Sequence, residues 1–550
     1  MPFDFKHKSP LIFTFLIALS ACGPTSSQIS DSSPIISSEQ TSTTSEQSVI
    51  PLDYEFDDSV SKMRGGAYYE IFVRSFADSD DDSIGDLRGV ADKMEYLNDL
   101  GVGGVWLMPI HPSPSYHGYD VNDYKAINAD YGTLEDFEYL ISEADKNEVD
   151  VIIDFVINHT SKFHPWFVEG KENFKNGNFV ASDNSNKANW YNFSWQGQEV
   201  VYEAGFGDWM PDLNLDNPAV REEIASIAQF WLDLGVKGFR LDAVSWFYRG
   251  NNSKTIQFLS WLKQTVEAIK PGAYIVGEAW EAETIITDFY QGIDSLFNFG
   301  GANSGGYIID FITSNIGSSL AFKIASTYRN AYAINEDALV ATFLTNHDMD
   351  RSSQMFIMNL PQRQKLAASI YLLTPGIPFM YYGEEIGLKG NRLSAQTDAN
   401  RRLPMIWQRG TDPWRTNVPP GTDYSMSNQV KEGAYTLLEQ PFSLTNHYKK
   451  VLNVRNQYPF LLNARVEQVT LPNNYLVALK YTSINEDIKP IYVIHNVNSQ
   501  SEQFALSRLD EDTANLFIAH DIFTSLVRVE KDNNNKITLG AFSSVIIEER

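Results

Sequence analysis

Apolar runs alternate with amphipathic stretches through most of the chain. Residues 67–76 (AYYEIFVRSF) predict a strand, and residues 86–100 show the spacing of an amphipathic helix. The same order recurs, with strands predicted at 102–110 and 149–159 and a helix at 133–148 between them. Strands that are apolar along their length and alternate with helices are typical of a parallel sheet covered on both faces. The fold class is therefore predicted to be α/β.

Polar residues close the predicted strands, and their spacing indicates how many units there are. Asp242 and Glu278 are 36 positions apart, Glu278 and Asp348 are 70 apart, and Asp348 and Glu384 are again 36 apart. These steps fit one βα unit, two units and one unit. The count predicts a (β/α)8 TIM barrel with its functional groups at the carboxyl ends of the strands. The longer gap between Asp154 and Asp242 indicates an insertion after the third strand.

The rest of the chain is predicted to form two further domains. Residues 160–216 are rich in Asn, Trp, Gly and Phe and poor in helical periodicity, which predicts an irregular inserted β domain over the mouth of the barrel. After a helix predicted at 440–458, short alternating runs with Asn-rich turns predict an antiparallel β-sandwich domain at 459–550. The barrel then consists of residues 63–159 and 217–458.

The chain is strongly acidic, with a formal net charge of -27 over 550 residues. Nucleic acids and anionic membrane surfaces would repel such a protein, so no nucleic-acid partner is expected. A neutral substrate fits better. The 11 Trp and 27 Tyr residues provide flat apolar faces that suit sugar rings, although most aromatic residues of a large protein lie in its core.

The first residues resemble the signal peptide of a bacterial lipoprotein. An apolar run at 11–19 is too short to span a bilayer and ends in LSAC, which places Cys22, the single cysteine, at the lipidation point. The alternative is a small buried cysteine. Residues 1–21 are thus predicted to be the signal peptide and residues 22–62 a Ser/Thr-rich tether. The protein is expected to be extracytoplasmic and lipid-anchored to a bacterial membrane, either periplasmic or at the cell surface.

The stretch GFRLDAV at 238–244 carries two charges in an apolar run. Arg240 and Asp242 are two positions apart, so both side chains point to the same side of a strand. Buried charges must pair or take part in chemistry. We interpret Asp242 as a nucleophile whose carboxylate Arg240 keeps ionised and oriented by charge-assisted hydrogen bonds.

Four motifs follow one another at barrel spacing: DFVINH at 154–159, GFRLDAV at 238–244, GEAW at 277–280 and FLTNHD at 343–348. Together and in this order they resemble the α-amylase family, glycoside hydrolase family 13. MPDLN at 210–214 also resembles a signature of the intermediate group between oligo-1,6-glucosidases and neopullulanases, which includes lipoprotein α-amylases. The resemblance covers nearly the whole chain after the tether.

This resemblance implies three catalytic acids. Cleavage with retention needs one carboxylate that attacks the anomeric carbon and one protonated carboxyl, about 5 Å away, that protonates the leaving oxygen. Matched residue by residue, Asp242 is the nucleophile, Glu278 the acid/base, and Asp348 the carboxylate that favours the oxocarbenium-like transition state. The apolar setting of Glu278 and the nearby negative charge should raise its pKa. Each acid taken singly could equally be a salt-bridged residue at a strand end.

The resemblance also implies the residues that bind the substrate. His159 and His347 match two histidines that hydrogen-bond sugar hydroxyls, and in the string HGYD Tyr119 would stack on the sugar while Asp120 would bind its hydroxyls. The substrate-binding residues implied by the resemblance also include two arginines, Arg240 and Arg402.

Two further features of the resemblance concern the surroundings of the nucleophile. Arg402 belongs to the stretch RRLPM, which together with Asp398 resembles a loop that borders the active site in these relatives. Ala243, directly after the nucleophile, is smaller than the valine of relatives that prefer α-1,6 bonds, which favours α-1,4 bonds.

The loop DSDDDSIGD at 78–86 places carboxylates at alternate positions, where they can surround a hard cation. It resembles the calcium loop of the oligo-1,6-glucosidase-like members and implies a structural Ca2+. A solvated acidic turn is the alternative, although neighbouring acids repel one another without a cation. The implied ligands are the side chains of Asp78, Asp80, Asp82 and Asp86 and the carbonyl group of Ile84.

The sequence thus predicts a retaining glycoside hydrolase of the α-amylase type, which cleaves α-1,4-glucosidic bonds in starch-type glucans or malto-oligosaccharides through a covalent glycosyl-enzyme intermediate. An α-glucan transglycosylase or an oligosaccharide α-glucosidase of the same family would carry the same carboxylates. A glucan-binding surface lipoprotein without activity is the alternative outside enzymes, but such relatives have lost the carboxylates that this chain keeps.

Overall fold

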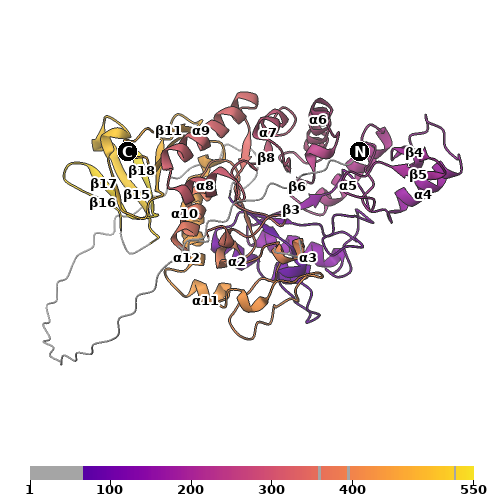
Figure 1. The fold of residues 1–550 in the computed structure, drawn as a ribbon, viewed down its shortest axis with the longest axis horizontal. Coiled ribbons are helices and arrows are strands. Elements are labelled where there is room, and N and C mark those ends of the chain that lie inside the picture. The colour runs from indigo at the N-terminus through magenta and orange to yellow at the C-terminus, as the bar shows by residue number, and fades with distance from the viewer. Residues whose placement is uncertain (1–65, 357–360, 393–396, 525–527, 550) are drawn as a thin grey trace, which may run out of the picture. The chain divides into compact units, whose positions relative to one another are not determined.

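The computed structural model describes residues 66–356, 361–392, 397–524 and 528–549 of the chain (Figure 1). The predicted signal peptide, the lipidation site Cys22 and the tether all lie outside the described residues.

Eight short parallel strands form the centre of the structure: β1 (Tyr68–Ile71), β2 (Gly104–Leu107), β3 (Asp150–Phe155), β6 (Gly238–Leu241), β7 (Tyr274–Gly277), β8 (Ser295–Phe297), β9 (Leu339–Ala341) and β10 (Phe379–Tyr381). They pair in the order β10-β1-β2-β3-β6-β7-β8-β9. Backbone hydrogen bonds from Ile377 N to Val340 O (3.2 Å) and from Phe379 N to Thr342 O (2.8 Å) join the two remaining edges. The predicted (β/α)8 barrel is confirmed.

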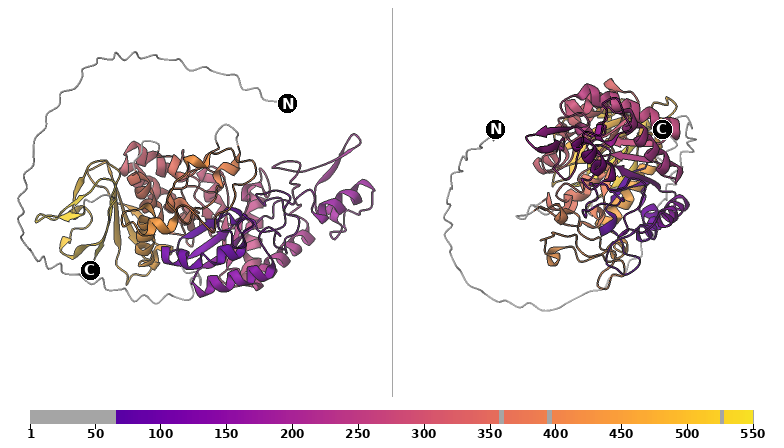
Figure 2. Two further views of the ribbon diagram at one scale, coloured as in Figure 1. Left: turned by 90° about the horizontal axis from the view of Figure 1, so that it is seen from below. Right: turned by 90° about the vertical axis from the view of Figure 1, so that its right-hand side faces the viewer.

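Helices surround this sheet, so that its strands are buried on both faces (Figure 2). Between β1 and β2 the single predicted helix at 86–100 is divided at Asp92 and Lys93, because Lys93 turns inward to lie against Trp407 and Trp414. The helices around the barrel are α1 (Leu87–Ala91), α2 (Met94–Leu100), α3 (Leu134–Lys146), α5 (Pro218–Asp233), α6 (Asn252–Ile269), α7 (Glu283–Phe289), α8 (Tyr307–Ser314), α9 (Gly317–Ile334), α10 (Pro361–Leu372), α11 (Ala434–Leu438) and α12 (Leu444–Asn456).

The insertion after β3 contains a helix as well as β structure. Helix α4 (Pro165–Lys175) precedes the antiparallel hairpin of β4 (Phe193–Gln196) and β5 (Glu199–Tyr202), which extends away from the barrel sheet (Figures 1 and 2). The sequence predicted only irregular β structure here. Local signals start the helix, since His164 caps it and Pro165 occupies its first turn. An isolated β-bridge between His159 and Asp212 ties the end of the insertion to the barrel.

The C-terminal part is built from two antiparallel sheets, as predicted. Strand β12 shows why they pack as a sandwich, because Val477 and Leu479 join the barrel core beside α9 while Leu476 and Ala478 face the second sheet. The strands are β11 (Arg465–Gln468), β12 (Leu476–Thr482), β13 (Ile491–Asn496), β15 (Leu516–Ile522) and β18 (Ser544–Glu549) in one sheet, and β14 (Glu502–Ala505), β16 (Glu530–Lys531) and β17 (Lys536–Leu539) in the other.

No helix in the described part of the chain combines the length and apolar character needed to cross a membrane.

Candidate active site

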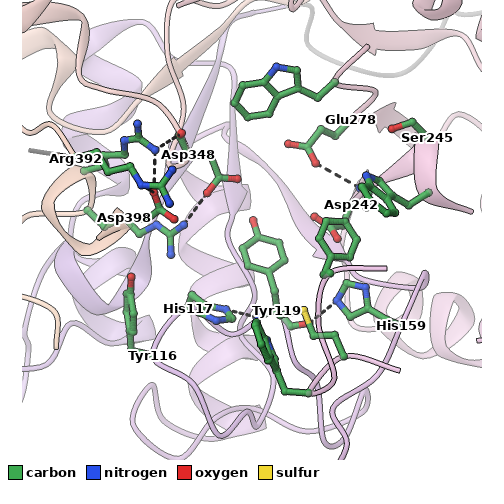
Figure 3. A pocket seen from close by; sticks show the side chains of 18 residues that line it. Tyr116, His117, Tyr119, His159, Asp242, Ser245, Glu278, Asp348, Arg392 and Asp398 are labelled. Carbon is green, nitrogen blue, oxygen red and sulfur yellow. Dashed lines mark hydrogen bonds and ion pairs between the residues drawn. The ribbon is translucent and has the colours of Figure 1, made fainter. Parts of the chain in front are cut away.

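A pocket of about 480 Å³ opens at the carboxyl ends of the barrel strands (Figure 3). Asp242 directly follows β6, Glu278 directly follows β7, and Asp348 comes from the loop after β9. All three side chains line the pocket, because parallel strands present their carboxyl ends on one rim. The structure therefore brings the three predicted catalytic acids together.

One buried guanidinium holds two of these acids. Arg240 is fully buried, with Nη1 2.8 Å from Asp242 Oδ1 and Nη2 2.7 Å from Glu278 Oε1. Asp154, which lies in register with Arg240 on the neighbouring strand, accepts from Nη1 at 2.9 Å. Because both nitrogens belong to one planar group, the carboxyls of Asp242 and Glu278 are held side by side at the edge of the same pocket.

The backbone after the nucleophile candidate takes an uncommon turn. Ala243 has a φ of 55°, in the left-handed region that residues with a Cβ rarely adopt. The turn directs two backbone N–H groups at Glu278. Ala243 N donates to Glu278 Oε2 at 3.3 Å, and Val244 N donates to the Glu278 carbonyl at 2.8 Å. The two acids are thus joined through the backbone as well as through Arg240.

Glu278 has the properties of a general acid. Its burial raises the pKa to about 7, against the opposing effect of the Arg240 guanidinium, and the negative charges of Asp242 and Asp348 raise it further. A carboxyl with such a pKa is about half protonated at pH 7 and can deliver a proton to a leaving oxygen.

Asp348 is kept ionised by two cations. Burial would raise its pKa, but His347 and Arg402 outweigh burial and hold the pKa of this carboxyl well below its usual range. Nε2 of His347 lies 3.2 Å from Oδ2, and Arg402 Nη2 donates to Oδ1 at 2.7 Å. Two neighbouring acids of one pocket are therefore held in opposite protonation states by their surroundings.

The other predicted substrate-binding residues lie at this pocket or directly behind it. Tyr119 and His159 line it, and the ring of Tyr119 stacks on His347 with centroids 5.4 Å apart. His159 donates through Nε2 to the Tyr119 carbonyl at 3.1 Å, so a protein group already uses this nitrogen. Asp120 is buried behind the lining, where it accepts hydrogen bonds from Ser113 and Ser115.

The site residues predicted from the sequence did not include two buried acids that lie behind the pocket. Asp154 accepts from both Arg240 and Tyr119, the latter at 2.9 Å, and Glu70 on β1 contacts His347. A signal existed for Asp154, since it is a polar residue near the end of an apolar strand. For Glu70 the signal was weaker: a single carboxylate in the middle of a strand that the sequence predicts to be buried.

The two walls of the pocket differ in character. Phe206, Trp209 and Trp280 are each about half exposed, at 41%, 45% and 50%, and with Trp246 they form an aromatic wall. This wall comes from the insertion and from the loops after β6 and β7.

The opposite wall is ionic (Figure 3). Asp398 pairs with Arg401 at 2.8 Å and with Arg392 at 3.5 Å, and Arg402 completes this side. Flat apolar faces on one side and fixed hydrogen-bonding groups on the other suit a ligand made of linked sugar rings.

The acidic loop partly matches its predicted ligand set. Asp78, Asp80 and Asp86 offer carboxylate oxygens that all lie within 4.8 Å of one another, a spacing that one cation can bridge. Asp82 does not belong to this group, and its Oδ1 accepts from the backbone N–H of Ile84 at 2.6 Å. Three of the four predicted carboxylates therefore meet.

Comparison with known proteins gives consistent matches along the chain. The model "Alpha amylase, catalytic domain" matches residues 70–464. The chain is 37% identical over 502 residues to "Alpha-amylase 3" of Dictyoglomus thermophilum, which covers 88% of this chain and 93% of that protein. It is 29% identical over 451 residues to a 4-alpha-glucanotransferase of Thermotoga neapolitana, covering 78% and 95%. The solved structure of Eubacterium rectale Amy13B superposes with a TM-score of 0.81 at 34% identity, covering 88% of this chain and 95% of that chain.

The raised pKa of Glu278 predicts the high-pH side of the activity profile. The acid acts only when protonated, so kcat/KM for a sugar leaving group should fall as pH rises through about 7. Glu278→Gln should lower the rate at pH 6 by roughly two orders of magnitude or more and should remove this pH-dependent fall. On a 4-nitrophenyl glycoside, whose leaving group departs without a proton, Glu278→Gln should lose much less activity. A wild-type rate that stays constant to pH 9 would contradict the assignment.

Proposed function

Because the chain belongs to the α-amylase family, we propose that it is a retaining hydrolase that cleaves α-1,4-glucosidic bonds in starch-type glucans or malto-oligosaccharides. The observation that carries the proposal is the buried Arg240, whose two terminal nitrogens contact Asp242 and a Glu278 with a pKa of about 7. Retaining cleavage needs one carboxylate and one carboxylic acid side by side.

The reaction follows from the position of Asp242 and from the pKa of Glu278. Asp242 attacks the anomeric carbon while Glu278 transfers its proton to the leaving oxygen, so a glycosyl–Asp242 ester forms as the glycosidic bond breaks. Glu278, now ionised, then takes a proton from water, whose oxygen attacks the anomeric carbon and releases Asp242. Asp348 stays ionised throughout and stabilises the positive charge that develops on the sugar ring in both steps.

Specificity for α-glucans is supported by the shape of the pocket and by a relative. The aromatic wall offers faces for sugar rings beyond the cleaved bond, and the ionic wall would fix the ring that becomes attached to Asp242. The D. thermophilum relative is named an α-amylase. The small Ala243 beside the nucleophile supports α-1,4 rather than α-1,6 bonds.

The second candidate function is glucan transfer, in which a sugar hydroxyl instead of water accepts the glycosyl group. One observation favours it. The T. neapolitana relative is named a 4-alpha-glucanotransferase, and an aromatic wall could hold an acceptor sugar as well as a leaving one. Chromatography of early products from maltotriose separates the two. Glucose and maltose in equal amounts support hydrolysis, and oligomers longer than maltotriose support transfer.

Asp242→Asn should lower glucan hydrolysis by roughly a thousandfold or more, because the amide cannot form the covalent intermediate. The side chain keeps its size, so the melting temperature and circular dichroism spectrum should stay close to those of the wild type. Asp294→Asn provides the control, since it removes a carboxylate paired with Lys263 on the outside of the barrel. Hydrolysis by Asp242→Asn at the wild-type rate would refute the proposed mechanism.

We further propose that the acidic loop binds a structural Ca2+ through Asp78, Asp80 and Asp86. The cation would offset the repulsion among these carboxylates and fix the loop before α1, which Asp86 also caps. It would take no part in the chemical steps.

Removal of calcium should therefore lower stability. With free Ca2+ at 100 times its Kd, binding would contribute about 2.7 kcal/mol, so a chelator should lower the melting temperature by several degrees and added Ca2+ should restore it. Asp80→Asn should weaken this response strongly. Asp82→Asn, which changes the same charge in the same loop, should leave most of it. A melting temperature that is unaffected by the chelator would exclude the site.

Finally, we propose that Cys22 is lipidated and that residues 22–62 tether the catalytic barrel to a bacterial membrane. The support is the sequence LSAC after a short apolar run, followed by a Ser/Thr-rich stretch. The full chain expressed in a bacterium should partition into the detergent phase on Triton X-114 extraction, and Cys22→Ala should move it to the aqueous phase or leave it unprocessed. Ser27→Ala in the tether is the control. Equal partitioning of the wild type and Cys22→Ala would contradict the anchor.

A further inference from the structure

A buried acid outside the predicted catalytic set lies directly behind the pocket. Glu70, in the middle of β1, is 2% exposed, and its Oε1 lies 2.5 Å from Nδ1 of His347. The two residues come from strands that are not neighbours, because β10 lies between β1 and the loop after β9. The contact therefore crosses the inside of the barrel. The His347 backbone N–H also points to the same oxygen, at 3.4 Å.

The hydrogen bonds on the other side of His347 define its protonation. Nε2 lies 2.8 Å from the hydroxyl of Tyr119, and that hydroxyl donates its one proton to Asp154 at 2.9 Å. The Tyr119 oxygen can then only accept, so Nε2 must donate. The Glu70 oxygen that contacts Nδ1 also accepts from the His347 backbone N–H, so it acts as an acceptor and Nδ1 donates to it as well. A histidine that donates through both nitrogens is an imidazolium.

The charges around His347 agree with this assignment. Burial lowers its pKa, but Asp348 and Glu70 outweigh burial and raise the pKa to about 10. Arg402 donates through Nε to the His347 carbonyl at 3.1 Å, and Arg402 and Arg240 are each paired with an acid of the pocket. The titratable and charged groups that face His347 are Glu70, Tyr119, Asp154, Arg240, Glu278, Asp348 and Arg402.

We propose that Glu70 is a positioning residue, which holds His347 as a fixed imidazolium so that Nε2–H points into the active site beside Asp348. In this role Glu70 does not touch the substrate. It fixes the orientation of the ring through a buried charge-assisted hydrogen bond, and it makes His347 a permanent cation next to Asp348. Asp348 then remains ionised, as its proposed part in the reaction requires. The inference rests on the proposed function for its kinetic part only.

The decisive variant is Glu70→Gln, which keeps the size of the side chain and an oxygen that can accept from Nδ1 but removes the charge. In this variant His347 should titrate at lower pH than in the wild type, because one of its two carboxylate neighbours is lost. The titration is read from the imidazole ¹⁵N shifts of the full chain, with the His347 signals assigned by comparison with His347→Asn.

The kinetic signature is a loss that depends on pH. At pH 5.5, where His347 of Glu70→Gln can still take up a proton, kcat/KM on malto-oligosaccharides should stay within about threefold of the wild type. At pH 8.5 the loss should reach roughly tenfold to a hundredfold, as expected for one charge-assisted hydrogen bond. A full pH profile of each protein separates this loss from the titration of Glu278, whose pKa the His347 charge also lowers. Glu70→Leu, which removes the acceptor too, should lose activity at both pH values.

Glu385→Gln is the matched control. Glu385 is equally buried, but it accepts hydrogen bonds from Tyr69 and Tyr96 instead of from a pocket residue. Glu385→Gln therefore tests how the loss of a buried carboxylate by itself affects activity. It should leave both the His347 titration and the kinetic ratio unchanged.

Three results would overturn the proposal. One is a loss in Glu70→Gln that is the same at pH 5.5 and 8.5, as a purely structural role would give. Another is an unchanged His347 titration in that variant. The third is a neutral His347 in the wild type at pH 7. This measurement needs no variant, so it would refute the proposal even if Glu70→Gln did not fold. A wild type that does not cleave glucans would refute the proposed function, while the titration would still test the proton state of His347.

Discussion

The site depends on a shortage of positive charge. Arg240 is one buried cation, and three carboxyl groups, those of Asp154, Asp242 and Glu278, contact it. Ionised carboxylates in a low-dielectric interior are costly unless each is neutralised, so the cluster lowers its free energy by keeping protons. Burial accordingly raises the pKa of Asp154 to about 6 and that of Glu278 to about 7. The raised pKa of the proposed general acid thus follows from its burial, beside one arginine that it shares with two other acids.

The other half of the pocket has the opposite balance. There His347 and Arg402 provide two cations beside the two acids Glu70 and Asp348, and together they keep Asp348 ionised. Tyr119 connects the two halves, since its hydroxyl contacts His347 on one side and Asp154 on the other. A proton donor and a permanent anion can therefore face the same sugar ring, because each half of the pocket neutralises its own charge.

The barrel supplies the rigid frame for this balance. Asp242 and Glu278 directly follow buried strands, and Arg240 and Asp154 lie near the carboxyl ends of theirs, where pairing on both sides fixes the backbone. The loops then add what the strands cannot: the insertion and the loops after β6 and β7 bring the aromatic wall, and the segment around Arg401 brings the ionic wall. The strand ends thus carry Asp242 and Glu278, and the loops give the pocket a shape that suits a chain of sugar rings.

Local patterns in the sequence were enough for the barrel, for the Arg240 and Asp242 pair and for the three acids, because strand periodicity, strand ends and short motifs are all written in consecutive residues. The predicted elements did not include α4, although His164 and Pro165 are local signals for its start. Nor did they include the break between α1 and α2, where Lys93 packs against Trp407 and Trp414 in the folded chain. Local patterns also did not reveal that Glu70 meets His347, that Asp154 shares Arg240, or that Asp82 stays apart from its neighbours. Those contacts depend on the register and closure of the strands, and only the folded chain brings such residues within reach of one another.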